Sequence, residues 1–261
     1  MCAFDRTRQW KCLYYFRIFS RVSETWKLDD FKQERTRPMS YGQNAPQGFQ
    51  SYGTTTAATF TGQMVSYAIQ SGLNQDIFTG DPVVLDAGYL KPVTDGTTVK
   101  LLSAMPVGIF QGCQWNSPDA NVQGLAKSPY WAANTVVQPF GGVTSAYAWV
   151  INDPHATWNL QVSTSADAAA DTATVKADQI GFYATWGIKK EGETLQPPNP
   201  GKGSTATGQS GVYLDASKMS ADPVGLPLVI LGLTPMPGNA LGKPFNNVLV
   251  GWNPKIVKPG A

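Results

Sequence analysis

With 261 residues and a net charge of +2, the chain is long enough for one large or two modest domains, each with its own core. Only 15% of the residues are charged, and glycine, proline and small polar residues are plentiful, which favours many short strands joined by turns. Apolar runs fall short of the roughly 18 residues of a membrane span, and the body has no basic stripe for nucleic acid. We therefore expect an all-β protein that binds neither membranes nor nucleic acid.

Residues 1–38 differ from the rest of the chain, because they are rich in aromatic residues, contain no glycine and carry nine Lys/Arg against five Asp/Glu. Two interpretations are open: a basic arm that docks on a partner, or an upstream extension whose true start is Met39. We favour the extension. The segment is not a convincing signal peptide, since Arg17 interrupts its apolar run and no small-residue cleavage site follows.

Residues 42–61 are glycine, glutamine, serine and threonine with isolated aromatics, which predicts an extended, weakly ordered arm that can become ordered on a neighbouring subunit. We group residues 1–61 as this extension and arm. Residues 64–70 are a short apolar stretch, either a strand or one helical turn. They lead into a central β lobe, which we place at residues 62–145.

The central lobe is organised around residues 77–115. Gly80, Asp81 and Pro82 favour a turn that precedes a short buried strand at residues 83–85, and the Asp95-Gly96 pair favours a hairpin. A further strand is predicted for residues 107–115. Its alternation assigns one face to Val107, Ile109, Cys113 and Trp115, and the opposite face to Gly108, Phe110, Gly112 and Gln114.

The second β lobe is placed at residues 146–261, and strand exchange between the lobes is compatible with the pattern. Alternating residues 147–151 and 156–162, joined by Asn152-Asp153-Pro154, predict a hairpin. Further strands are expected at residues 227–233 and 247–252. Residues 163–179 predict a surface loop or one short helix, and residues 189–211 predict a long Pro/Gly/Ser-rich loop of the kind that is often functional.

Candidate catalytic residues are few. His155 is the single histidine, and we assign it to the turn of the predicted hairpin in preference to general-base catalysis, which needs a partner within hydrogen-bond reach. A Cys113/His155 dyad is conceivable, but Cys113 is placed on an apolar strand face, where a free cysteine acts as a small buried hydrophobe. One histidine and three dispersed cysteines argue against a zinc or iron centre. We predict no catalytic, metal-binding or cofactor-binding residues.

Other candidate sites have simpler structural explanations. Asp81, Asp86 and Asp95 could pair as carboxylates or bind calcium, but Asp81 and Asp95 stand at turn positions that favour aspartate. The segments at residues 208–211 (GQSG) and 201–205 (GKGST) lack the spacing of a nucleophile elbow and of a phosphate loop. Trp149 and Trp158, expected to face each other across the hairpin, could form a sugar-stacking platform, although core packing is favoured.

Two stretches carry a resemblance to a known class. They are residues 80–113 and, in this order along the chain, the segments at residues 150–154, 203–205, 208–212, 228–233 and 246–250. Together, over about residues 60–253 and without a signature motif, they resemble the head decoration or cement proteins of tailed bacteriophages. The resemblance implies a non-enzymatic, all-β protein that binds the major capsid protein in many copies, associates with itself on the shell, and is made in the host cytoplasm before it joins the virion.

The function expected from this resemblance is capsid decoration and stabilisation. Repetition on a shell supplies avidity, and the arm at residues 42–61 and the loop at residues 189–211 are expected to make the contacts. The alternative is a glycan-binding module of a virion fibre or cell surface that uses Trp149 or Trp158. An enzyme is the third possibility.

Overall fold

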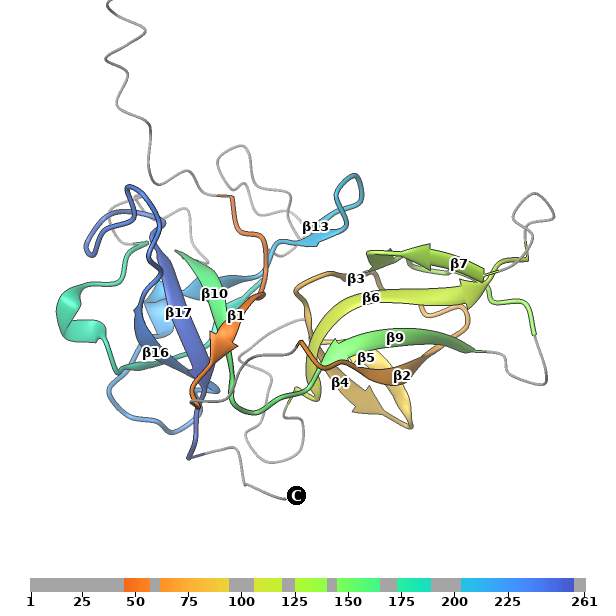
Figure 1. Ribbon diagram of the computed structural model, residues 1–261, viewed down its shortest axis with the longest axis horizontal. Coiled ribbons are helices and arrows are strands. Elements are labelled where there is room, and N and C mark those ends of the chain that lie inside the picture. Colours follow the sequence, from red (N-terminus) through yellow and green to blue (C-terminus); the bar gives the residue numbers. More distant parts are fainter. Residues whose placement is uncertain are drawn as a thin grey trace, which may run out of the picture. The chain divides into compact units, whose positions relative to one another are not determined.

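The computed structural model describes residues 45–56, 62–93, 106–118, 125–139, 145–164, 173–188 and 203–255, all within the compact unit Tyr41–Ala261. The basic extension at residues 1–38 lies outside these ranges. The described residues form strands and two single-turn 3-10 helices, η3 (Ala177–Gln179) and η4 (Ala216–Lys218). The predicted all-β class is confirmed (Figure 1). No helix within the described ranges has the length and apolar character needed to cross a membrane.

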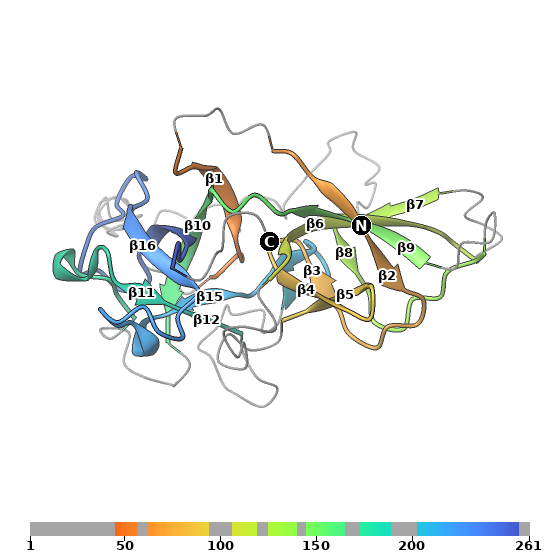
Figure 2. The same ribbon diagram turned by 90° about the horizontal axis from the view of Figure 1, so that it is seen from below.

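The first lobe is built on a six-stranded antiparallel sheet, five strands of which curl into a barrel. These five strands, in spatial order, are β2 (Val65–Gln70), β9 (Ser145–Ile151), β6 (Gly108–Asn116), β4 (Pro82–Asp86) and β5 (Tyr89–Pro92). β5 returns beside β2, which nearly closes the barrel (Figure 2). The sixth strand, β7 (Leu125–Ser128), pairs with the second half of β6. A separate two-stranded sheet joins β3 (Ile77–Phe78) to β8 (Tyr130–Trp131). Residues 64–70 therefore supply a strand and not a helical turn.

Side chains alternate along these strands, and those on the inward face fill the barrel. On β9 the three inward residues are small or β-branched, which leaves room for larger side chains from the other elements. The buried cluster comprises Ile69, Leu73, Ile77, Val83, Leu90, Phe110, Cys113, Trp131, Val137, Ala146, Ala148 and Val150. The strand predicted at residues 83–85 is present as part of β4, but Leu85 at its end is exposed.

A tight turn at Ala87-Gly88 joins β4 to β5. Both residues have positive φ, 50° and 86°, as a type I′ hairpin turn requires. The sequence does not predict this turn, because alanine is not one of the residues that favour a positive φ. The hairpin predicted at Asp95-Gly96 lies outside the described residues.

A β-bulge in β6 makes the faces of this strand differ from the prediction. The pairing of β6 with β9 shifts register between Phe110 and Gly112, so the alternation is interrupted there. Ile109 consequently points into the core of the second lobe, whereas Phe110 and Cys113 both point into the barrel. The prediction that Ile109 and Cys113 share a face is wrong. Gly112 has a φ of +141°, which disfavours other residues.

The second lobe is built on an antiparallel sheet in the order β11 (Tyr183–Ala184), β16 (Leu228–Leu233), β17 (Asn247–Trp252) and β10 (Ala156–Ser163). β1 (Gln50–Thr54) pairs with β10 along its length. The end of β10 pairs in parallel with β15 (Tyr213–Asp215), and β15 pairs with β12 (Trp186–Gly187). The arm was predicted to be weakly ordered; residues 50–54 are instead a paired strand of this sheet.

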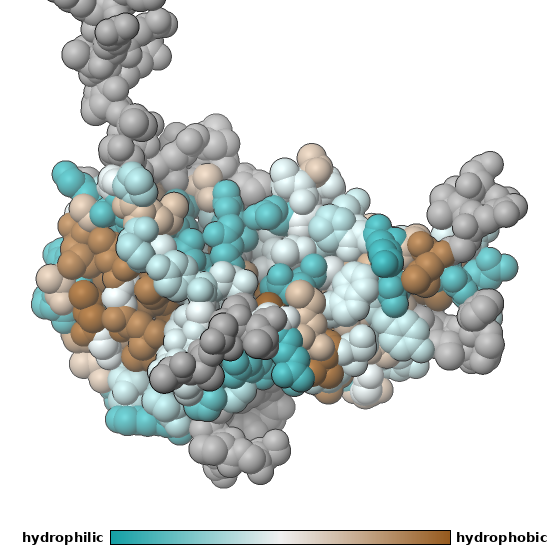
Figure 3. Space-filling model, viewed as in Figure 1, coloured by the Kyte–Doolittle hydropathy of each residue, from teal (hydrophilic) through white to brown (hydrophobic). Residues whose placement is uncertain are grey.

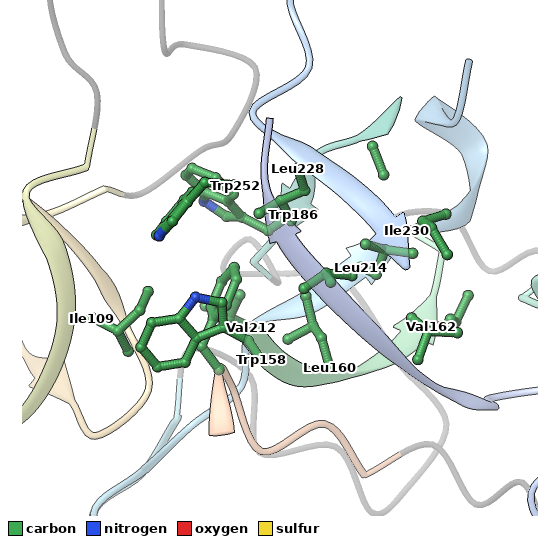
Figure 4. Close-up of a cluster of buried hydrophobic side chains, with 14 of the residues drawn as sticks. Ile109, Trp158, Leu160, Val162, Trp186, Val212, Leu214, Leu228, Ile230 and Trp252 are labelled. Carbon is green, nitrogen blue, oxygen red and sulfur yellow. The ribbon is translucent and has the colours of Figure 1, made fainter. Parts of the chain in front are cut away.

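Aromatic side chains fill the second core. Phe49, just before β1, packs edge-on against Trp158 and Trp186 and stacks on Trp252, with ring centroids 5.8 to 6.1 Å apart. Figure 4 shows Trp158, Trp186 and Trp252 around this centre, with Ile109 of the first lobe reaching toward Trp158. Because Phe49 is buried among the three indoles, the described part of the arm contributes to the core.

The hairpin predicted at residues 147–162 is not formed. β9 pairs with β2 and β6, and β10 pairs with β1 and β17, so the two strands belong to different sheets. The change of sheet falls between Ile151 and Ala156. The boundary placed between residues 145 and 146 is therefore wrong, since β9 belongs wholly to the first lobe.

Candidate functional site

The candidate catalytic residues Cys113 and His155 are not brought together. Cys113 is 0% exposed, and its thiol lies 3.8 Å from the Ser128 carbonyl oxygen and 3.6 Å from that of Tyr130. Burial raises the pKa of this thiol to about 12, so it is poorly suited to act as a nucleophile. His155 lies exposed in the turn after β9, where its carbonyl accepts a hydrogen bond from the Thr55 N–H.

The three candidate carboxylates are also separate. Asp86 is exposed and forms an ion pair with Lys91 across the β4–β5 hairpin. Asp95 lies outside the described residues. Asp81 is buried, and no group of three or more potential metal ligands occurs within the described ranges.

Asp81 is a buried carboxyl group of the first lobe whose hydrogen-bond partner Ser210 lies far along the chain. Its Oδ2 accepts the Phe78 N–H at 2.7 Å, and its Oδ1 accepts the Ser210 hydroxyl at 2.5 Å. Burial raises the pKa of the Asp81 carboxyl to about 7, with a further contribution from the nearby Asp76, although both hydrogen bonds oppose the increase. The carboxyl is thus held in an environment that disfavours its charge.

Ser210 belongs to a hairpin that docks on the barrel. β13 (Gly203–Ser204) and β14 (Gln209–Ser210) form this hairpin, and the Ser210 N–H donates to the Thr79 carbonyl at 3.0 Å. A side chain at Gly203 would collide with Phe78, since an added Cβ would lie 2.4 Å from the ring. The described end of the loop predicted at residues 189–211 is therefore engaged within its own chain; residues 189–202 lie outside the described ranges.

This docking explains the candidate motifs at residues 201–205 and 208–211. Their described glycines and serines allow close packing, and Ser210 serves as a hydrogen-bond donor to Asp81 and as an acceptor for the Val212 N–H. Ser204 likewise accepts the Thr207 N–H within the turn. The described residues of both motifs make structural contacts.

Trp149 and Trp158, predicted as a facing pair, occupy different environments. Trp158 is 0% exposed in the second core. Trp149 lies half-exposed on the outer face of the barrel, opposite Gly112 on β6 and Ser66 on β2. The facing pair is therefore wrong, and only Trp149 remains accessible to a partner.

Around Trp149 a band of aromatic and polar residues crosses the barrel surface. Tyr147 is 41% exposed two residues before Trp149 on β9. Gln114 lies opposite Tyr147 on one side and opposite Lys127 of β7 on the other. The Lys127 Nζ is 6.0 Å from the centroid of the Trp149 ring. We call Ser66, Gln114, Lys127, Tyr147 and Trp149 the aromatic row.

A second exposed surface lies on the outer face of β16 and β17. Leu231 is 42% exposed at the bulge of β16, with Val229 beside it and Leu249 on β17, both half-buried. Figure 3 shows apolar side chains gathered over these two strands. We call Val229, Leu231 and Leu249 the aliphatic patch. The run LVILGL gives no local sign of this patch, because continuous apolar residues are also typical of a strand that is buried on both faces.

Comparison with known proteins gives no relatives: neither a family model, nor a curated protein, nor a solved structure matches the chain. What characterises the protein is its own structure: an all-β molecule of two lobes, with the aromatic row exposed on the first lobe and the aliphatic patch exposed on the second.

Proposed function

We propose that the protein is a non-enzymatic structural component of a virion that decorates and stabilises the capsid by binding the major capsid protein in many copies. The observation that supports this proposal best is the aliphatic patch on the outer face of β16 and β17. Contiguous exposed apolar surface on a soluble domain commonly marks a protein interface. Here it lies on a regular sheet, whose paired backbone gives the surface a fixed shape.

The patch is suited to a protein surface rather than to a charged ligand. Neither strand carries an ionisable side chain over residues 228–233 or 247–252. Burying such a surface contributes about 25 cal/mol for each Å² of apolar area removed from water, so one small patch gives modest affinity. Many copies that contact both the shell and each other would hold together far more tightly than one copy alone.

The patch replaces the arm and loop as the proposed contact surface. The described part of the arm pairs with β10, and the described end of the loop at residues 203–211 docks on the barrel. These segments already have partners within the chain. A shell contact through them would have to use residues outside the described ranges.

Co-sedimentation of the chain starting at Met39 with assembled phage capsids tests the proposal. The variant Leu231→Asp places a charge in the centre of the patch. The matched control is Val224→Asp, which places the same charge on a residue that is 76% exposed in the loop before β16. Thermal unfolding of both variants verifies that each remains folded.

We expect saturable binding at a fixed ratio to the capsid subunit, retained by Val224→Asp and weakened at least tenfold by Leu231→Asp. Equal binding by the two variants would remove the patch from the interface. Absence of binding to any capsid by the unmodified chain would reject the decoration function itself.

A further inference from the structure

The outer face of the barrel holds a second surface, independent of the aliphatic patch. The aromatic row draws its five residues from four adjacent strands, β2, β9, β6 and β7, and direct register brings them together. Since Ala146, Ala148 and Val150 point into the barrel, the residues between them on β9, Tyr147 and Trp149, point outward. The position of these side chains is thus fixed by the sheet.

Gly112 supports the indole of Trp149. A Cβ added at Gly112 would lie 3.5 Å from Cε3 and 3.7 Å from Cζ3 of Trp149, so the six-membered ring rests against the backbone of β6. Gly112 follows the unpaired residue of the bulge and has a positive φ, so the same glycine borders the bulge and supports the ring. The ring is held by the sheet and still remains half-exposed.

Polar side chains flank the rings of Tyr147 and Trp149. Ser66 is exposed on one side of Trp149, and Gln114 and Lys127 lie on the other side of β9. Neither of the ion pairs found among the described residues involves Lys127. Its distance of 6.0 Å from the Trp149 ring is at the outer limit of a cation–π contact. Lys127 is exposed and has no ion-pair partner among the described residues, so an anion bound at the Trp149 ring would meet its ammonium group.

We propose that the aromatic row binds an anionic glycan, with one pyranose ring stacked on Trp149 and its carboxylate paired with Lys127. The C–H face of a pyranose is apolar and matches an aromatic ring, while its hydroxyl groups need hydrogen-bond partners of the kind that Ser66, Gln114 and Tyr147 offer. A uronate or sialate carboxylate forms a charge-assisted hydrogen bond with an ammonium group. Lys127 is the only charged residue of the row, which selects an acidic sugar over a neutral one.

A glycan array followed by calorimetry tests this proposal. The array carries uronate-containing, sialate-terminated and neutral oligosaccharides. Calorimetry then compares a galacturonate hexamer with its methyl ester, which keeps the sugar rings and removes the charges. The variants are Trp149→Ala and Lys127→Gln. The matched controls are Tyr52→Ala, an exposed tyrosine on β1, and Lys176→Gln, an exposed lysine of the second lobe.

We expect retention of acidic glycans and a preference of at least fivefold for the galacturonate hexamer over its ester. Trp149→Ala should weaken binding of both at least tenfold. Lys127→Gln should abolish the preference while it leaves the affinity for the ester unchanged, and both controls should bind as the unmodified chain does. Retention of no glycan, or unchanged binding by Trp149→Ala, would overturn the proposal, and equal binding of neutral glycans would refute the role of Lys127.

The two surfaces can be told apart by the same proteins. Leu231→Asp lies on the other sheet and should bind glycan normally, while Trp149→Ala should bind capsids normally. If glycan binding fails and capsid binding persists, only the aromatic row loses its assignment.

Discussion

Replacing Asp81 with asparagine tests whether the hairpin contact holds a carboxyl group against its ionised form. The side chain is 4% exposed, and burial raises its pKa from 3.8 to about 7. Asparagine has the same shape without the charge. Its amide oxygen can accept the Phe78 N–H while its amide nitrogen donates to the Ser210 oxygen, which reproduces the hydrogen bonds of a protonated Asp81.

The direction of the pH effect follows from the raised pKa. The folded protein binds this proton more tightly than the unfolded chain, so between about pH 4 and pH 7 the unfolded chain has lost a proton that the folded protein keeps. Each rise of one pH unit in that window lowers the free energy of unfolding by about 1.4 kcal/mol, and above pH 7 the loss is complete. From pH 5 to pH 8, wild type should lose about 3 kcal/mol relative to Asp81→Asn.

Urea denaturation of both proteins at several pH values between 5 and 8, at constant ionic strength, measures this difference. Other titrating groups cancel when the two curves are subtracted. Ser210→Ala provides a second test, because it removes the hydroxyl that stabilises the ionised carboxylate and should therefore cost more at pH 8 than at pH 5. A stability difference between wild type and Asp81→Asn that stays constant with pH would refute the raised pKa. A gain in wild-type stability relative to Asp81→Asn as pH rises would show that the hydrogen bonds outweigh burial.

Three further predictions concern the packing. Gly108→Ala should lower the free energy of unfolding by about 3 kcal/mol, because the added Cβ would lie 2.2 Å from a carbonyl oxygen of β9. The matched control Gly232→Ala, whose Cβ would meet nothing within 4 Å, should lower it by less than about 1 kcal/mol. Phe49→Ala should cost about 4 kcal/mol and Tyr52→Ala less than about 1 kcal/mol, and equal costs in urea denaturation would show that the arm is not part of the core. In a chain starting at Met39, Cys113 should react with a thiol reagent at pH 8 only as fast as the protein opens; rapid labelling of the native protein would contradict its burial.

Strand positions could be predicted from the sequence because burial of one face imposes a period of two. Residues 227–233 and 247–252 were predicted as strands, and β16 and β17 lie there. The burial of Cys113 was predicted for a related reason, since a cysteine between apolar neighbours on a strand favours the core. Such local signals can be read from the sequence because each inward position must be apolar, whichever strand lies beside it.

The faces of β6 could not be predicted beyond Phe110, because the bulge shifts the period by one residue. The only local sign is a glycine in the strand interior, which is compatible with a bulge, a bend or a close backbone approach. In this strand Gly112 marks the bulge, and Gly108 marks the close approach to β9. The shift brings Cys113 onto the same face as Phe110, inside the barrel, while Ile109 on the opposite face enters the second core.

The contact between Asp81 and Ser210 has no local signature, since 129 residues separate the two positions. The sequence explained Asp81 as a turn residue, and that explanation accounts for its bond to the Phe78 N–H. It leaves out the second carboxylate oxygen, whose partner comes from the β13–β14 hairpin. A turn aspartate with one oxygen engaged locally keeps the other free for a distant donor, and only the tertiary fold selects that donor.

The connection between β9 and β10 shows why alternation alone does not determine pairing. Residues 152–155 contain an Asn-Asp-Pro turn between two alternating segments, which is also the pattern of a hairpin. Alternation determines which side chains are buried, but each strand has two edges, and here both edges of both strands are occupied: β9 by β2 and β6, β10 by β1 and β17. Ile151 of β9 and Ile109 of β6 then enter the second core, so the two lobes share one apolar cluster. The short connection therefore joins two sheets that are already packed together, and the lobes should unfold as one cooperative unit.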